Sequence, residues 1–479
     1  MNDLKANSNI NNNFFVDIPV RSLIFILKKL RILALFKKHV RDSRAKKGTY
    51  SIESLLMVAL EILLFRAPSK NNFYQNRKLG RVNAYRNLGQ LAGIKEDCFP
   101  HSKTLDDAFW LLKPDDLEPC LFEIFEQLCS SKLFTNHPLL KKNGTYHLII
   151  DAVTSHTYYP SSQHPCESCP YCLKRCRKTK EGEKIWFLHI DVIASLIFEN
   201  GFQLPLQCHR IKKITEWDFL SEDDLKEECE LTALPIILQK IRTYLPKIPL
   251  TLLLDGLYAN QTVLTILKQF HCDYSIVLKR LTTVKDDFNS LPKDDFNSLP
   301  KDVHMRKIAP KRFFLTQTAQ FANDMVYENH QFSVIDFTEY AQKKPNKRFA
   351  KVNYKQVHYQ WMTSKKINAS NIFKQAQASR NRWWEEDLFQ TLKKRGFSFE
   401  HDYSRHPNSQ WVWLFLTLIA FAITSILQLC DLGILARKKR TIIAFMEQML
   451  QDLFYLSYEM IFLCIYPQQL RFSLWSGAS

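Results

Sequence analysis

Acidic residues are missing from one long stretch of this chain. Residues 340–384 hold eleven Lys or Arg and no Asp or Glu, while residues 1–50 hold eleven basic against three acidic residues. These two segments account for the whole formal net charge of +18, and the rest of the 479 residues is close to neutral. A basic excess confined to two segments favours a polyanion partner over a general solubility device. An anionic membrane surface is the alternative.

A secretory signal is also lacking. The first twenty residues are polar and rich in Asn, without an apolar core or a small-residue cleavage site. Twelve cysteines are too few for a disulfide scaffold of this length, so clustered cysteines are first read as metal ligands or buried thiols. We expect a cytoplasmic, nucleoid-associated protein. A hydrophobic fraction of 46% with 24% charged residues excludes a fibrous or wholly disordered chain.

Two apolar segments raise the question of a membrane. Residues 411–430 contain no charged residue, which meets the length of a span. They also contain polar residues and follow a segment that has the pattern of an active-site helix, so we predict a buried core helix and no membrane partner. Residues 21–40 are interrupted by Lys or Arg at every turn or two, as in a basic amphipathic helix. Such a helix suits lipid, DNA or a small helical domain.

Hydrophobic periodicity divides the chain. Residues 1–140 show the three- and four-residue spacing of helices, with strong patterns at 51–65 and 102–134. Strands are then predicted at 145–151, 185–198, 202–211, 249–255 and 274–280. Asn200-Gly201 predicts a hairpin turn between the second and third of them. Helices are predicted at 221–245, where Ser221 and Asp224 form a capping pair, and at 259–270.

The second half begins with a tandem repeat of KDDFNSLP at 285–292 and 293–300. Two such short copies do not make a solenoid, so we predict a duplicated surface loop. Aromatic alternation over 303–365 predicts a mostly-β subdomain. Residues 370–396 predict one long helix, capped by Ser370 or Asn371 and ended by Gly396.

Carboxylates stand at three notable positions. Asp151 and Asp255 each close a predicted strand, and the helix at 370–396 carries Glu385, Glu386 and Asp387. A carboxylate at the end of a buried strand is costly unless it meets a cation or a partner. Convergent carboxylates bind Mg²⁺ or Mn²⁺, and two such ions about 4 Å apart support phosphoryl transfer. Arg382, Glu386 and Lys393 share one helix face, which suits a metal ligand beside two phosphate-binding groups.

In this order the sequence resembles the RNase H-like DDE transposases. Residues 255–260 (DGLYAN) and 149–157 (IIDAVTSHT) resemble the segments around their first two catalytic aspartates, and 389–403 is similar to the stretch after their catalytic glutamate. The helix is similar to the Tyr-x2-Arg-x3-Glu-x6-Lys signature of the insertion-sequence group, matched by Arg382, Glu386 and Lys393. The resemblance covers about 145–435. Ser379 stands at the Tyr position, so that aromatic DNA contact is missing or supplied elsewhere.

The resemblance implies two-metal DNA strand cleavage and transfer by an insertion-sequence transposase. Asp151, Asp255 and Glu386 would bind Mg²⁺ (or Mn²⁺), with Arg382 and Lys393 on DNA phosphates. Glu385 is the rival third carboxylate, but Glu386 alone keeps both spacings of the signature. The implied partners are double-stranded DNA, as terminal inverted repeats and as target, and a second copy of the chain in the DNA complex. The alternatives are a nuclease on the same fold without strand transfer, and a non-catalytic DNA- or membrane-binding protein.

The basic stretch interleaves with aromatic residues, as in surfaces that bind phosphates and stack on bases. The candidate DNA contacts are Lys343, Lys344, Lys347, Arg348, Lys351 and Trp361. Affinity for DNA should then fall steeply with salt. A β subdomain with a solvated basic face is the alternative. The N-terminal basic helices would bind the ends of the element.

Four cysteines are packed into eleven residues at Cys166, Cys169, Cys172 and Cys176, with His156 and His164 just upstream. Four thiolates, or three thiolates and one imidazole, would bind a structural Zn²⁺ and hold together a loop too short for a core. The spacing also matches half of a ferredoxin-type iron–sulfur run, but no second run and no following Pro are present. Free or redox-active thiols are the third interpretation.

The sequence thus predicts an α/β protein with an RNase H-like mixed sheet and flanking helices, interrupted by a mostly-β insertion. The predicted parts are a helical DNA-binding domain (1–140), the first catalytic part (141–281, with a Cys-rich loop at 160–180), the insertion (282–367), the second catalytic part (368–435) and a helical tail (436–479).

Overall fold

The structure is a computed structural model. It describes residues 19–44, 48–78, 82–94, 99–130, 145–160, 164–180, 182–198, 201–214, 221–279, 281–291, 302–308, 313–343, 354–429 and 442–463. Two compact units share the chain: unit 1 holds residues 1–143, 151–229 and 386–479, and unit 2 holds 144–150 and 230–385. Both contain helices and strands, so the protein is of the predicted mixed α/β class.

Unit 1 contains most of the helices. They are α2 (Pro19–Lys29), α3 (Ile32–His39), α4 (Ile52–Leu64), α5 (Lys70–Lys78), α6 (Val82–Leu91), α7 (Ser102–Leu111), η1 (Pro114–Leu117), α8 (Glu118–Ser130), α16 (Pro407–Leu429), α18 (Ile442–Tyr455) and the π-helical turn η6 (Glu459–Leu463). The predicted helical character of the N-terminal region is confirmed for its described residues. The described part of the helical pattern at 102–134 forms α7, η1 and α8, because the ring of Pro114 cannot continue an α-helix.

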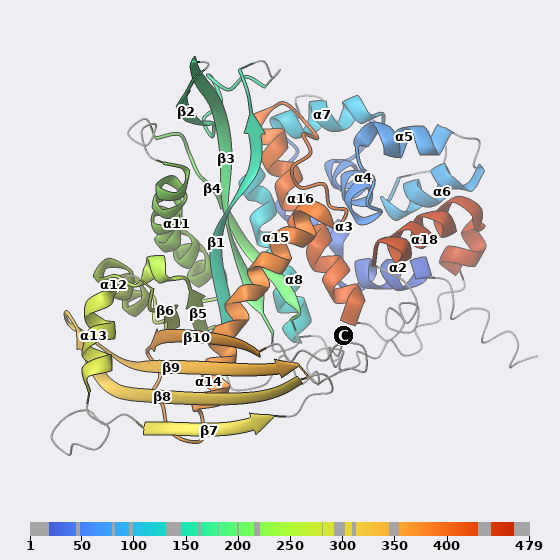
Figure 1. The fold of residues 1–479 in the computed structure, drawn as a ribbon. Coiled ribbons are helices and arrows are strands. Elements are labelled where there is room, and N and C mark those ends of the chain that lie inside the picture. The colour runs from blue at the N-terminus through green and yellow to red at the C-terminus, as the bar shows by residue number, and fades with distance from the viewer. Residues whose placement is uncertain are drawn as a thin grey trace, which may run out of the picture. The chain divides into compact units, whose positions relative to one another are not determined.

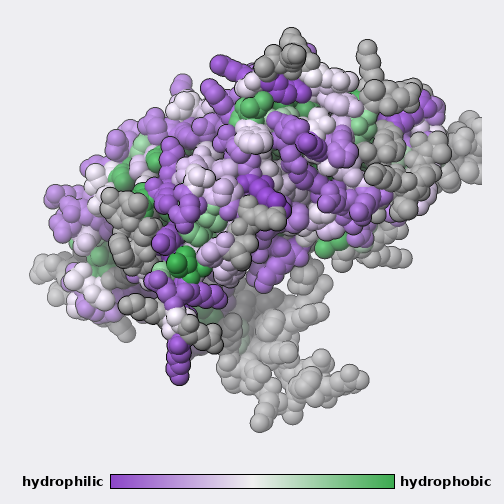
Figure 2. Space-filling view, turned by 90° about the horizontal axis from the view of Figure 1, so that it is seen from above, coloured by the Kyte–Doolittle hydropathy of each residue, from purple (hydrophilic) through white to green (hydrophobic). Residues whose placement is uncertain are grey.

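Helix α16 is the central helix of unit 1. It packs against α2, α4, α7 and strand β4 (Gln203–Arg210), as Figure 1 allows the reader to follow. Of the described helices it alone is long and apolar enough to cross a membrane, yet its apolar window is entirely buried within the protein. The prediction of a core helix is therefore confirmed. On the face seen in Figure 2, hydrophobic residues form only small groups among hydrophilic ones.

The basic segment at 21–40 forms two helices rather than one. Arg31, between α2 and α3, has a positive φ of 47°, so the chain turns there. Leu23, Ile24 and Phe36 are at most 1% exposed, which leaves the apolar face covered by the protein itself. The C-terminal helix α18 packs on α2 and α6, and Asp452 Oδ2 accepts a hydrogen bond from Val20 N. The apolar face of this segment is therefore buried in a helical unit, with Lys28, Lys29 and Lys37 exposed.

The strands of unit 1 follow one another as hairpins. They are β2 (Leu173–Thr179), β3 (Gly182–Ile197) and β4. Strand β3 pairs with β2, with β4 and with β1. The predicted hairpin turn is confirmed: Gly201 has φ 82°, and Phe198 N donates to Phe202 O at 3.0 Å. Strand β1 (Tyr146–Tyr158) is longer than predicted. Asp151 therefore lies inside a strand and does not end one, because the β-rich pattern continues through the polar residues after it.

Unit 2 includes residues 146–150 of β1. Its sheet order is β1, β5 (Leu250–Leu254), β6 (Asp273–Val277), β10 (Tyr354–Thr363), β9 (His330–Lys343), β8 (Phe313–Tyr327) and β7 (Asp302–Ile308). Strand β5 runs parallel to β1 and to β6, while the contacts from β6 through β7 are antiparallel. Figure 1 shows β7 to β10 as one layer of long strands. The β-rich character predicted for 303–365 is thus observed.

The remaining helices lie in unit 2, except that the first part of α11 and most of α15 belong to unit 1. They are α11 (Glu222–Tyr244), η4 (Gly256–Tyr258), α12 (Gln261–Gln269), α13 (Thr282–Ser290), α14 (Ile372–Arg380), η5 (Asn381–Trp383) and α15 (Trp384–Lys394). The cap at the start of α11 is confirmed, since Ser221 Oγ accepts from Asp224 N at 3.1 Å and donates to its carboxylate at 2.7 Å.

Two expectations need correction here. The first repeat copy is not a loop, because α13 continues through Ser290 and buries Phe288; the second copy, 293–300, lies entirely outside the described residues. The helix predicted over 370–396 is interrupted by the 3₁₀ turn η5, so Arg382 does not share a regular α-helix with Glu386. Its end at Gly396 (φ 93°) is as predicted.

Candidate metal centre and the predicted carboxylates

The cysteine-rich loop after β1 folds into a tight turn beside β3. Cys169 N donates to Pro165 O, and Cys166 N donates to His164 O, both at 2.9 Å. The β2–β3 pairing begins at Leu173 and Leu188, so Cys172 and His189 are the next residues along the two antiparallel strands. The strand pairing thus brings Cys172 next to His189, which lies 17 residues later in the chain.

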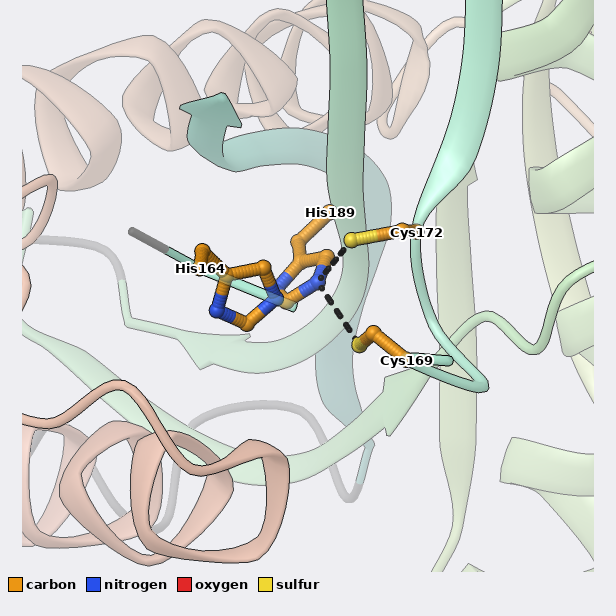
Figure 3. Close-up of side chains that lie close together, drawn as sticks. All are labelled: His164, Cys169, Cys172 and His189. Carbon is orange, nitrogen blue, oxygen red and sulfur yellow. Dashed lines mark hydrogen bonds between the residues drawn. The ribbon is translucent and has the colours of Figure 1, made fainter. Parts of the chain in front are cut away.

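Four side chains converge there: His164, Cys169, Cys172 and His189. One ligand atom from each lies within 4.8 Å of the others, and all four residues are buried. His189 Nε2 is 3.1 Å from Cys172 Sγ and 3.4 Å from Cys169 Sγ, as the dashed lines in Figure 3 mark. Two thiols and two imidazoles at this spacing could hold a metal ion.

The electrostatics favour the metal-binding state at Cys169 and His189, and oppose it at Cys172 as long as Cys169 is the thiolate. Cys172 is hydrogen-bonded to Cys169 and lowers the pKa of Cys169, with further help from His164 and His189; the pKa of Cys172 is raised in turn. Burial lowers the pKa of His189, which keeps its imidazole neutral. Thiolate sulfur and neutral imidazole nitrogen are the forms in which these side chains coordinate metals.

Aromatic and amide groups surround the cluster. The rings of Tyr158 and His164 stack with centroids 4.1 Å apart at 13°. Gln410, from α16, donates to Tyr158 Oη and to Asp402 Oδ1, and its amide nitrogen lies 3.4 Å from His164 Nδ1. These contacts fix the orientation of the His164 ring.

The observed group differs from the four cysteines predicted. Cys169 and Cys172 are in it, but Cys176 is exposed on β2 and donates to Glu183, and buried Cys166 lies beside Cys172 without joining the four. His164 was visible as a candidate upstream of the cysteines. His189 was missed, because nothing in a β-rich run marks it as a ligand until the β2–β3 register is known.

Asp255, the second predicted carboxylate, directly follows β5 in unit 2. Its side chain is 43% exposed, and Arg382 Nη2 lies 3.9 Å from its Oδ1. The pairing of β1 with β5 matches Ile149 with Leu253, and Asp151 and Asp255 each follow that pair by two residues. Asp151 is half-buried, and its Oδ1 accepts from Ala152 N at 2.9 Å.

The third carboxylate has two candidates with opposite burial. Glu385 is fully buried, whereas Glu386 is exposed on α15. Lys393, predicted to contact phosphate, pairs with Glu400 Oε1 at 2.7 Å. The units divide between Glu385 and Glu386 and between Ile150 and Asp151, so Asp151 and Glu386 belong to unit 1 and Asp255 to unit 2.

Ser379 of the signature and Trp361 of the basic stretch are both buried. Ser379, at the Tyr position, is 3% exposed, and its Oγ lies 2.6 Å from Ser275 Oγ of β6. Trp361 is 2% exposed and packs with Phe337 and Ile372 in the core of unit 2. Trp361 as a DNA contact is therefore wrong: its position in β10 directs it to the face covered by α14. Of the basic candidates, Lys344, Lys347, Arg348 and Lys351 lie outside the described residues, as does the side chain of Lys343.

Gly256 allows the end of β5 to approach β6 closely. A Cβ atom there would lie 2.5 Å from Lys279 Cβ and 3.1 Å from Val277 O. Gly256→Ala should destabilise the protein by about 1–3 kcal/mol through overpacking, measured by denaturant unfolding. Gly89→Ala is the control: its Cβ would meet only contacts of 3.8 Å or more in helix α6, so no loss is expected. Equal stability of the two variants would contradict this account of the β5 end.

No protein-family model matches the chain, and no curated protein matches it in sequence.

Proposed function

We propose that this protein is a DDE transposase that cleaves DNA at the ends of an insertion sequence and joins them to target DNA. The observation that carries the proposal is the equal placement of two aspartates. Asp151 in β1 and Asp255 after β5 each stand two residues beyond the Ile149–Leu253 pair of two parallel neighbouring strands. Carboxylates at matching positions of neighbouring strands are suited to binding the same cations.

The element order supports an RNase H-like catalytic fold. Strand β1 is followed by the short strand β2, which pairs with β3, by the hairpin strands β3 and β4, and then by α11, β5, α12 and β6. The β-rich stretch with β7 to β10 comes next, and the chain then enters the helical segment with Arg382 and Glu386. Apart from β2, this is the order that the sequence resemblance implies. Strand β5 runs parallel to β1 and to β6, as expected for strands joined by crossover connections that contain helices.

Asp151, Asp255 and Glu386 would hold Mg²⁺, whose hard character fits their oxygen ligands. Bound Mg²⁺ would supply activation of the attacking oxygen and stabilisation of the leaving oxygen in phosphoryl transfer. Arg382 would then balance charge at Asp255 while its remaining N–H groups bind a DNA phosphate. Lys393 would exchange its exposed partner Glu400 for a second phosphate, at little cost because a solvated ion pair is weak.

The basic segments would hold the DNA. Lys28, Lys29 and Lys37 are exposed on α2 and α3, whose apolar sides are buried. Residues 340–384 add eleven cations without an acidic residue. We propose that both segments bind the phosphates of the terminal inverted repeats, with a second protein copy in the complex. The buried His/Cys group would hold a structural ion, Zn²⁺, and no step of the chemistry passes through it.

The test uses the DNA that flanks the gene. Duplexes carrying the terminal inverted repeats, incubated with the full-length protein and Mg²⁺, should be nicked at the repeat ends. The same reaction with Ca²⁺ or with a chelator should give no nicks. The absence of Mg²⁺-dependent nicking on any duplex would leave a non-catalytic DNA-binding protein as the function.

A further inference from the structure

We propose that His164, Cys169, Cys172 and His189 bind one structural Zn²⁺ ion as a two-thiolate, two-imidazole site. This inference concerns unit 1 alone and does not depend on DNA chemistry. Its ligand set departs from the four-cysteine set that the sequence spacing favours, because it includes a histidine from strand β3.

The distances agree with tetrahedral coordination. Zn–N and Zn–S bonds of about 2.1 and 2.3 Å place neighbouring ligand atoms about 3.4–3.8 Å apart. The His189 Nε2 distances to the two sulfurs are 3.4 and 3.1 Å, and all four ligand atoms lie within 4.8 Å. The side chains thus need only small adjustments around an ion.

Hydrogen bonding alone accounts poorly for the arrangement. A neutral imidazole nitrogen has one proton or one lone pair, yet His189 Nε2 faces two sulfurs. Among the described residues, His164 Nε2 is buried without a hydrogen bond of ordinary geometry, and His164 is 6% exposed. A cation between the sulfurs and the imidazoles satisfies these buried polar atoms together.

The donor chemistry selects the ion and its role. Two soft thiolates exclude Mg²⁺ and Ca²⁺, which prefer oxygen. A ferredoxin-type cluster needs four cysteine ligands, and this group offers two. Four protein ligands leave no open position for water or substrate, so the ion is structural. It would tie the loop after β1 to β3, and Gln410 would hold the His164 ring in place from α16.

Metal analysis of the full-length protein, purified without chelator, tests the proposal. We expect one zinc per chain in the wild-type protein. His189→Ala and Cys172→Ser should each lose the bound zinc. Cys176→Ser, a change of the same residue type on the exposed part of β2, should keep it. Zinc retained by His189→Ala, or lost from Cys176→Ser, would overturn the ligand set.

A spectroscopic measurement on the wild-type protein covers the case in which a variant fails to fold. X-ray absorption at the zinc edge should find two sulfur and two nitrogen neighbours. Four sulfur neighbours, iron in place of zinc, a Cys169–Cys172 disulfide, or no zinc uptake by the fully reduced protein would each reject the proposal. Because these readouts require no DNA, they remain decisive even if the protein does not cleave DNA.

Discussion

Replacing Asp255 by Ala should lower the rate of Mg²⁺-dependent DNA nicking on the order of 10³-fold or more, with the fold retained. A metal-binding carboxylate stabilises charge that develops in the transition state, and the loss of such a group costs rate rather than stability. The Asp255 side chain is 43% exposed and its contact with Arg382 is long, at 3.9 Å, so its removal should scarcely affect unfolding. Single-turnover nicking of an end duplex measures the effect.

Asp273→Ala is the matched control for this change. Asp273 also lies in unit 2, and its side chain is 48% exposed and 4.0 Å from Lys365. It pairs in register with Thr251, at the opposite end of the parallel strands from Asp255. We expect nicking to stay within a few-fold of wild type. If Asp255→Ala cleaves as fast as Asp273→Ala, Asp255 has no role at the reacting phosphate.

Replacing Asp191 by Asn should destabilise the protein by about 3–5 kcal/mol, a large part of the stability of an ordinary domain. Asp191 and Arg210 are cross-strand partners on β3 and β4, both with fully buried side chains, and form two hydrogen bonds of 2.8 and 2.9 Å. Burial opposes the charged form of Asp191, but Arg210 outweighs it and holds the pKa of that carboxyl below its usual range. The amide would leave the Arg210 charge buried without a counter-charge and would lose one of the two hydrogen bonds.

Denaturant unfolding measures this loss, and Asp387→Asn is its control. Asp387 pairs with Arg395 at 2.8 Å in the same unit, but their side chains are 56% and 48% exposed, so the cost should stay below about 1 kcal/mol. Replacing both buried partners, Asp191 by Leu and Arg210 by Met, should recover much of the stability. Similar losses of unfolding free energy for Asp191→Asn and Asp387→Asn would contradict the claim that burial makes the Asp191–Arg210 pair costly to break.

Local signals in the sequence predicted local structure well. The hairpin turn at Gly201, the Ser221 cap and the helix end at Gly396 each depend on backbone angles or on side chains three residues apart. The burial of α16 also followed from its polar residues and its place in the chain. These features need no knowledge of distant partners, which is why they could be predicted.

Features that depend on pairing between distant segments were missed. His189 joins the candidate metal site only because β2 and β3 align it beside Cys172. Trp361 is buried because its strand turns it toward α14, while the charges around it suggested a surface. The interruption of the long helix at η5 has no Gly or Pro to announce it. The sequence therefore located the strands and helices that carry these residues, but not which side chains would meet or which would be buried.

The joining of element ends to new DNA tests the central proposal most directly. The full-length protein, Mg²⁺ and a precleaved end duplex with an exposed 3′-hydroxyl would be incubated with a supercoiled target plasmid. A transposase should yield plasmids with the labelled end joined covalently at many positions, and Asp255→Ala should yield none. Nicking of intact end duplexes, together with no joined product from the precleaved end, would contradict strand transfer and identify the protein as a nuclease on this fold.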